Sequence, residues 1–277
     1  LAKYKSARVI VGLVLRHSQH MVDLRSAIDS EILGPIASLE ASEHIAPYHG
    51  AFFMRDWRRM NEHSGGFMLE KCCHDLDLYN MITGSRPKRV ASFGGRRSFL
   101  PSHAPASNSE SAIFHIKESV WNSVDDPFHS DGDIVDCQTA LVEFESGASM
   151  SFHTNTNVPD EHRRFCIVGA TGMAEGDFVR GYLKVTRRDG SLFANHDYSI
   201  NETTNNSAHY GADHLMIQDV VAFLRQEKNG LPVSIVDALE AGIGAIAIDQ
   251  ARSSGQIVDL SPIWKEFDSY NLRENKE

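Results

Sequence analysis

The sequence predicts an α+β domain in which one large, predominantly antiparallel open sheet carries its helices on one face. Helical patterns come early, short strand patterns separated by glycines fill residues 134–198, and helical patterns return at the end. Sequential short strands joined by tight turns are typical of an antiparallel meander. The second face of such a sheet is then either solvated or covered by a partner.

The first elements follow from hydrophobic periodicity and stop signals. Residues 8–16 (RVIVGLVLR) are β-branched and nearly uninterrupted, which is typical of a strand covered on both faces. Residues 22–30 follow as a helix that ends before a Gly-Pro pair. Residues 36–45 alternate between polar and apolar side chains, as a strand does, and residues 51–59 (AFFMRDWRR) are expected as a loop.

The middle of the chain continues with one helix and one strand. Residues 68–83 form a helical pattern that a glycine and then a proline close. Residues 90–99 predict a strand in which Gly94-Gly95 marks either a bulge or a close approach of two backbones. Residues 101–110 are rich in Ser, Pro and Ala and predict an exposed loop.

The remaining elements are short strands and two helices. The strands are expected over residues 139–144, 148–154, 165–168, 173–177 and 182–187. The helices are expected over residues 213–227 and 235–253. Gly242-Ile243-Gly244 lies inside the second helical pattern, where it cannot form a phosphate-binding turn. No recognisable dinucleotide-binding motif is present in this sequence.

Composition narrows the classes of partner. The 277 residues carry a formal net charge of −10, which argues against nucleic acid and anionic membrane surfaces because both reward basic patches. The longest apolar runs, residues 9–15 and 241–248, are far shorter than the ~20 residues of a membrane helix. We therefore expect a mildly acidic enzyme without a nucleic-acid partner or a membrane segment.

The cysteines indicate a reducing compartment. They are Cys72, Cys73, Cys137 and Cys166. An adjacent pair does not resemble a secreted disulfide framework, and no CxxC pair suggests a zinc knuckle. We expect reduced thiols in a cytoplasmic protein. The basic residues before residue 9 resemble those of a signal peptide, but the apolar run ends in Arg16-His17 without a cleavage site.

The segment SGGFMLEKCCHDLD (residues 64–77) holds the candidate chemistry. Glu70 and His74 are four residues apart, so on a helix their side chains share one face, and Asp77 follows three residues later on that side. A carboxylate one turn from an imidazole can fix its tautomer and raise its basicity. The ordinary alternative is a structural Glu–His pair on a helix surface. A metal site that also uses Cys73 matches no established spacing, so we expect no metal.

Two further groups of residues have functional and structural interpretations. Arg16, at the end of the first expected strand, either faces substrate or cofactor or forms a salt bridge at a domain junction. Trp57 and its arginine neighbours Arg55, Arg58 and Arg59 either clamp a polar or anionic substrate or form a solvated loop packed by its aromatic side chains.

The segment GGFMLEKCCHDLDLYNMITGSRPKRVASFGG resembles the helix-then-strand signature of the Gfo/Idh/MocA family of oxidoreductases. Residues 11–16 resemble the strand that leads out of that family's Rossmann domain, and residues 163–177 (RRFCIVGATGMAEGD) resemble its sheet hairpin. Residues 210–224 and 238–255 resemble its late helices. The resemblance covers nearly the whole chain and is specific in combination.

The resemblance implies an oxidation or reduction at the CH–OH group of a sugar, inositol or related polyol with NAD or NADP. It implies that His74 is the proton shuttle and that Glu70, where relatives more often carry Asp, binds a substrate hydroxyl and orients the histidine. Arg16, Trp57, Asp77 and His209 are then the candidate substrate-binding residues. Whether the protein is an enzyme stays open, because a sugar-sensing regulator and an NAD-dependent glycoside hydrolase are alternatives within the family.

The resemblance also implies a division of the chain. Residues 1–15 are expected to be the end of a Rossmann-type domain, and residues 16–277 the substrate-binding and oligomerisation domain, which forms a homodimer or tetramer through the open sheet face. The sequence contains no Glu-Lys-Pro motif, so the family's catalytic lysine and most of the cofactor site are expected outside this chain. The chain alone is then expected to be inactive. It begins with Leu1 rather than Met, which indicates that this residue does not start the gene product.

Overall fold

The computed structural model describes residues 9–106, 111–199 and 208–273. Within these residues, nine strands form one sheet in the order β8-β7-β6-β5-β1-β4-β3-β2-β9. The strands are β1 Ile36–His44, β2 Pro87–Gly95, β3 Cys137–Phe144, β4 Ser149–Asn155, β5 His162–Gly169, β6 Gly172–Asp177, β7 Tyr182–Arg187, β8 Leu192–Asp197 and β9 Val258–Asp259. Only β1 and β4 pair in parallel among them, so the predicted, mostly antiparallel α+β fold is confirmed.

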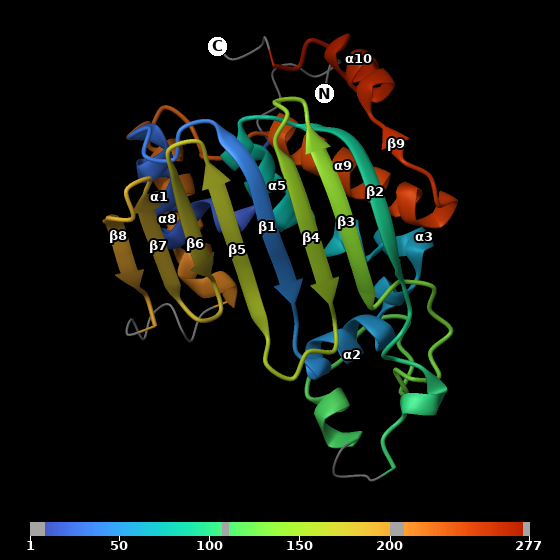
Figure 1. Ribbon diagram of the computed structural model, residues 1–277. Coiled ribbons are helices and arrows are strands. Elements are labelled where there is room, and N and C mark those ends of the chain that lie inside the picture. The colour runs from blue at the N-terminus through green and yellow to red at the C-terminus, as the bar shows by residue number, and fades with distance from the viewer. Residues whose placement is uncertain (1–8, 107–110, 200–207, 274–277) are drawn as a thin grey trace.

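Most of the longer helices gather on one face of this sheet. They are α1 Gln19–Asp29, α2 Pro47–Arg55, α5 Cys73–Thr83, α8 Ala212–Leu224, α9 Ile235–Ser254 and α10 Ser261–Asp268. Short helical turns are α3 Asn61–Ser64, α4 Phe67–Glu70, η1 Val14–His17, η2 Trp57–Arg59, η3 Pro101–His103, η4 Ala112–His115 and η5 Ala208–Gly211. Figure 1 shows α1, α5, α8 and α9 behind the sheet, whose other face is turned toward the viewer.

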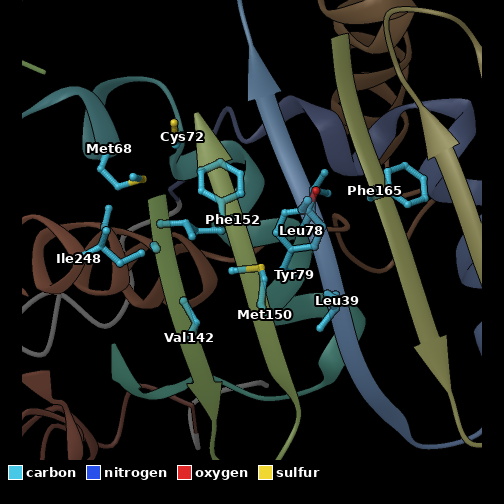
Figure 2. Packing of buried hydrophobic residues seen from close by; sticks show 14 of the residues in the cluster. Leu39, Met68, Cys72, Leu78, Tyr79, Val142, Met150, Phe152, Phe165 and Ile248 are labelled. Atoms are coloured by element: carbon cyan, nitrogen blue, oxygen red, sulfur yellow. The ribbon is translucent and has the colours of Figure 1, made fainter. Parts of the chain in front are cut away.

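The core fills the space between the sheet and these helices. On the central strand β1, Leu39, Ala41 and Glu43 point to the helical side and are buried, as the alternation of a strand requires. Figure 2 shows Phe152 of β4 and Ile248 of α9 among the labelled side chains of this layer. Burying each large apolar side chain of this kind contributes about 1.5–3 kcal/mol.

The expected first strand is wrong. Residues 9–13 have no regular structure, and Val14–His17 form a 3₁₀ turn. Leu15 is nevertheless fully buried, which explains the apolar run, because periodicity cannot distinguish a buried turn from a strand. The next helix begins three residues earlier than expected, since the Ser18 side chain caps it by accepting a hydrogen bond from the Met21 N–H.

The expected loop over residues 51–59 is also wrong. Residues 47–55 form α2, which begins with a proline at its first turn, and η2 follows directly. Four of its last five residues, including Arg55, are buried, so the arginine- and aromatic-rich composition belongs to packed helix and not to a solvated loop. Asp56 follows the last residue of α2. Its side chain caps the start of η2 by accepting a hydrogen bond from the Arg58 N–H.

The expected helix over residues 68–83 is broken into α4 and α5. Lys71 ends α4 with φ −118° and ψ −49°, and α5 begins at Cys73. The glycine stop signal is confirmed, since Gly84 closes α5 in the left-handed conformation with φ 58°. The expected strand 90–99 shifts to β2, Pro87–Gly95, and a side chain at Gly94 would lie 2.5 Å from the Cys137 carbonyl oxygen. Close backbone approach, and not a bulge, therefore explains this glycine.

The remaining predicted strands and helices are confirmed with small shifts of their ends, and, apart from short helical turns, three further elements of the described residues were missed. These are β8, the two-residue strand β9, and α10. The expected exposed loop 101–110 is only partly covered, because residues 107–110 lie outside the described residues. The four cysteines are free. Among the described helices, none has the length and apolar character that crossing a bilayer requires.

Candidate active site

His74 lies in the first turn of α5, on the helical side of the sheet. Its Nδ1 atom is buried and has no hydrogen-bond partner among the described residues. Burial, and then the neighbouring Arg163, Lys71 and His209, lower the pKa of His74 from 6.5 to about 3. Its ring centroid lies 5.7 Å from that of His209. His74 is therefore a neutral imidazole with an unsatisfied polar atom in a cationic environment.

A buried ion-pair network lies next to His74 in the core. Arg163 of β5 donates to both carboxylate oxygens of Asp75, at 2.8 and 2.6 Å, and lies 3.0 Å from a Glu43 oxygen. The Lys71 ammonium lies 3.1 Å from the other Glu43 oxygen. Burial alone would raise the pKa of Glu43, but Arg163 and Lys71 hold it below its ordinary value. The network joins β1, β5 and α5 through charged groups that have little freedom to move.

The structure does not bring Glu70 to His74. Glu70 is the last residue of α4, and the break at Lys71 removes the continuous helix on which the two side chains were expected to share a face. Glu70 instead accepts a hydrogen bond from Arg58 Nε at 2.5 Å. The carboxylate that acts on His74 is Glu43, whose negative charge offsets part of the lowering of the histidine pKa. The expected pairing of Glu70 with the histidine is therefore corrected.

Arg16 and Asp77 form a bidentate ion pair with each other. Arg16 donates from Nε and Nη2 to the two Asp77 oxygens at 2.7 and 2.6 Å, and from Nη1 to the Pro232 carbonyl at 2.9 Å. The two residues are 6% and 1% exposed, so both charged groups are already engaged inside the protein. This geometry corresponds to the salt-bridge interpretation of Arg16, and both Asp77 oxygens are engaged by Arg16.

His209 is brought beside His74 by a strained turn. His209 and Tyr210 both have left-handed backbones, with φ of 52° and 59°, immediately before Gly211 and α8. A left-handed conformation costs a non-glycine residue of order 1–3 kcal/mol and is frequent at functional sites. Asp213 lies 3.0 Å from His209 Nδ1 and orients the ring. Trp57 packs against Arg58, whose guanidinium carbon lies 4.5 Å from the indole centroid, and against Trp121.

Sequence reasoning missed three residues of this environment. Glu43 could have been found, because a carboxylate on the apolar side of a central strand must have a buried partner. His49 of α2 is largely buried, and burial followed by Lys71, Lys117 and His209 lowers its pKa to about 3. Lys117 comes from the segment after η4, and no local pattern in the sequence connects it to α2 or α5.

The glycines near the site have structural roles. Gly66, with φ 96°, packs so closely on α9 that an added Cβ would lie 2.4 Å from an Asp249 oxygen. Packing therefore explains it better than approach to a ligand. Gly242 and Gly244 lie inside α9, as predicted, so they form no phosphate-binding turn. The described residues hold no group of three or more His, Cys, Asp or Glu side chains arranged for a metal ion.

Comparison with known proteins agrees with this architecture. The family model described as "Oxidoreductase family, C-terminal alpha/beta domain" matches residues 25–260. "Putative oxidoreductase YteT" of Bacillus subtilis (strain 168) is 23% identical over 289 residues, which cover 88% of this chain and 66% of that protein. The chain thus spans a little under two thirds of this relative.

Solved structures share the fold. Levoglucosan dehydrogenase in complex with NADH and levoglucosan superposes with a TM-score of 0.70 at 14% identity, covering 94% of this chain and 70% of that one. Aldose-aldose oxidoreductase from Caulobacter crescentus gives 0.61 at 18% identity, covering 93% and 65%. The family match covers most of the chain, and the chain therefore belongs to the Gfo/Idh/MocA oxidoreductase family, whose C-terminal alpha/beta domain it contains.

Proposed function

We propose that this chain is the substrate-binding part of an NAD(P)-dependent oxidoreductase that acts on the CH–OH group of a sugar, inositol or related polyol. The observation that carries the proposal is the buried Nδ1 of His74, which has no partner in the described part of the chain and lies beside Lys71 and His209. An unpaired buried polar atom costs about 1–3 kcal/mol, and a ligand hydroxyl would remove that cost. The names of several structural neighbours, including levoglucosan dehydrogenase, support a sugar-like substrate.

His74 would handle the hydroxyl proton. When a hydroxyl-bearing carbon is oxidised, the hydroxyl proton must leave, and a neutral imidazole can accept it. A pKa of about 3 keeps His74 neutral near pH 7, so a ring nitrogen can accept the proton, and it also makes the imidazole a weak base that passes the proton on readily. The Lys71 ammonium, held by Glu43 at 3.1 Å, would stabilise negative charge that develops on the substrate oxygen. In the reverse direction the same ring nitrogen returns the proton.

The dinucleotide does not fit this chain by itself. Gly242 and Gly244 are helical, so they form no phosphate-binding turn. The described connections from a strand to a helix carry no GxGxxG sequence either. We therefore propose that residues 1–15 are the end of a Rossmann-type domain and that residues 16–277 bind the substrate. Most of the NAD or NADP site would then belong to residues outside this sequence.

The open sheet face suits assembly. Phe93 of β2, Leu141 of β3 and Val168 of β5 are 74%, 53% and 41% exposed. Apolar side chains exposed in this number on one sheet face are typical of an oligomer interface. We propose a homodimer or tetramer through this face, in the cytoplasm, where the four free thiols would stay reduced.

A turnover assay with the gene-length protein tests the proposed function. Sugars, inositols and polyols are supplied one at a time with NAD or NADP, and reduced cofactor and released sugar are both followed. Net formation of reduced cofactor supports the dehydrogenase. Release of a free sugar without reduced cofactor would indicate glycoside cleavage, and saturable binding without any turnover would indicate a sugar sensor.

A further inference from the structure

Cationic side chains converge on one helix beside the His74 environment. The Lys117 ammonium lies 3.2 Å from Nε2 of His49 and 4.6 Å from the centroid of the Phe52 ring, both on α2. The Arg58 guanidinium carbon lies 5.3 Å from the same ring. Lys71 lies close enough to lower the pKa of both His49 and Lys117. We call His49, Phe52, Arg58, Lys71 and Lys117 the Lys117 cluster.

The cations of this cluster differ in their counter-ions. Lys71 is paired with Glu43, and Arg58 is paired with both Glu70 and Asp56. Among the described residues, no carboxylate oxygen lies within 4.0 Å of the Lys117 ammonium, which instead contacts the neutral ring of His49. Burial, and then Lys71 and Arg58, lower the pKa of Lys117, and the more distant carboxylate of Asp56 offsets only part of this lowering. An ammonium placed among other cations, without a paired carboxylate among the described residues, is costly unless an anion joins it.

The cluster adjoins the proposed sugar site. Lys71 and His209 lower the pKa values of both His49 and His74, so the two histidines share these neighbours. The side chains are half-buried, and those of Lys71 and Arg58 are 15% and 27% exposed, which leaves contact with solvent. A ligand with a hydroxyl at His74 would therefore place another of its groups toward the Lys117 cluster.

We propose that the Lys117 cluster binds the negatively charged group, a carboxylate or a phosphate, of an acidic sugar, so that the substrate of this site is an anionic sugar. The inference rests on the proposed function. Lys117 supplies the counter-ion, Arg58 and Lys71 add positive potential, and the Phe52 ring packs beneath the cations. The anion does not have to displace a carboxylate from Lys117, which distinguishes this lysine from Lys71.

The test is an NMR titration of the 277-residue chain, read from the ring signals of His49 and His74. The probes are D-glucose, D-glucuronate and D-glucose 6-phosphate, which are neutral, carboxylate-bearing and phosphate-bearing forms of one sugar. The variants are the unchanged chain, Lys117→Gln, and Lys265→Gln as a matched control on the exposed side of α10. Circular dichroism checks that each variant is folded.

We expect at least one acid to bind about tenfold or more tightly than glucose, which corresponds to about 1.4 kcal/mol. The better acid identifies carboxylate or phosphate as the charged group. Lys117→Gln should bring the two affinities within about twofold, whereas Lys265→Gln should keep the preference. The His49 signal should respond to the acid and not to glucose.

Two results would overturn the inference. Equal affinity for acid and glucose, with a response at His74, would remove the anion site and leave the proposed sugar site standing. A preference for acid that survives Lys117→Gln would assign it to other residues. If no sugar changes the His74 signal, both the anion site and the proposed function are wrong.

Discussion

Arg163 of β5 and Asp75 of α5 form a bidentate ion pair, with N–O distances of 2.8 and 2.6 Å. Asp75 directly follows His74 in the chain. Both residues are fully buried, at 1% and 0% exposure. The pair ties the helix that carries His74 to the sheet, and the same guanidinium contacts Glu43. The position of the candidate catalytic histidine thus depends on a charge network and not on apolar packing alone.

Removing Arg163 should therefore destabilise the fold strongly. Arg163→Met leaves Glu43 and Asp75 buried with Lys71 as their remaining cation, and breaking a buried pair in this way costs about 3–5 kcal/mol. Urea denaturation measures the change in the free energy of unfolding. Arg164→Met, the exposed neighbour on the other face of β5, should change it by less than about 0.5 kcal/mol. Equal effects of the two substitutions would contradict the role of the network.

Buried neutral histidines should make the protein less stable in acid. Burial lowers the pKa of His20 from 6.5 to about 4, so the unfolded chain binds more protons than the folded one between these values. Its contribution is fully present above pH 6.5 and is lost as the pH falls toward 4. Thermal unfolding followed across this window should show a falling midpoint. The substitution His20→Phe should make the unfolding midpoint depend less on pH. The substitution His214→Phe, at an exposed position of α8, should leave the pH dependence of the midpoint unchanged. An unfolding midpoint that rises toward acid pH would contradict the statement that His20 is buried in its neutral form.

Glu70 should affect sugar binding in two separable ways. Glu70→Gln removes the substrate-hydroxyl acceptor that the family resemblance implies, so the affinity for D-glucose should fall by a few-fold, about 1 kcal/mol or less. It also removes the carboxylate that pairs with Arg58 at 2.5 Å, which leaves more positive potential at the Lys117 cluster. The ratio of D-glucuronate to D-glucose affinity should therefore increase. A ratio that is unchanged or smaller would show that Arg58 does not act on the anionic group.

The 277-residue chain should not bind the dinucleotide tightly. Because Gly242 and Gly244 are helical, no glycine-rich turn presents backbone N–H groups to a pyrophosphate in the described part of the chain. Calorimetric titration should give dissociation constants for NADH and NADPH above about 1 mM, weaker than about −4 kcal/mol. Micromolar binding would reveal a cofactor site within this sequence.

The sequence predicted the sheet well because its signals are local. Strands β3 to β7 are short and alternate regularly, glycines mark every connection among them except that between β4 and β5, and each was placed within a few residues. Elements without such signals were misassigned. Residues 9–16 are apolar because a turn is buried, and α2 was hidden by its aromatic and arginine content. The strand β9 has two residues, too few for any periodicity.

The candidate site was predicted only in part for a related reason. His74 was found from its motif, but its surroundings come from segments far apart in sequence, with Glu43 on β1, Lys117 after η4 and Arg163 on β5. The spacing of Glu70 and His74 assumed an unbroken helix, and the break at Lys71 redirects Glu70 to Arg58. Local patterns identify the histidine, whereas long-range packing decides which charges act on it.

The most direct test of the account is turnover by the gene-length protein after the substitution His74→Ala. If His74 transfers the hydroxyl proton, turnover should fall by about 10²-fold or more, the scale of acid–base catalysis, while His214→Ala on the exposed side of α8 leaves it unchanged. Thermal unfolding should confirm that both variants are folded. Turnover that survives His74→Ala in a folded protein would contradict the central claim that this imidazole carries the proton.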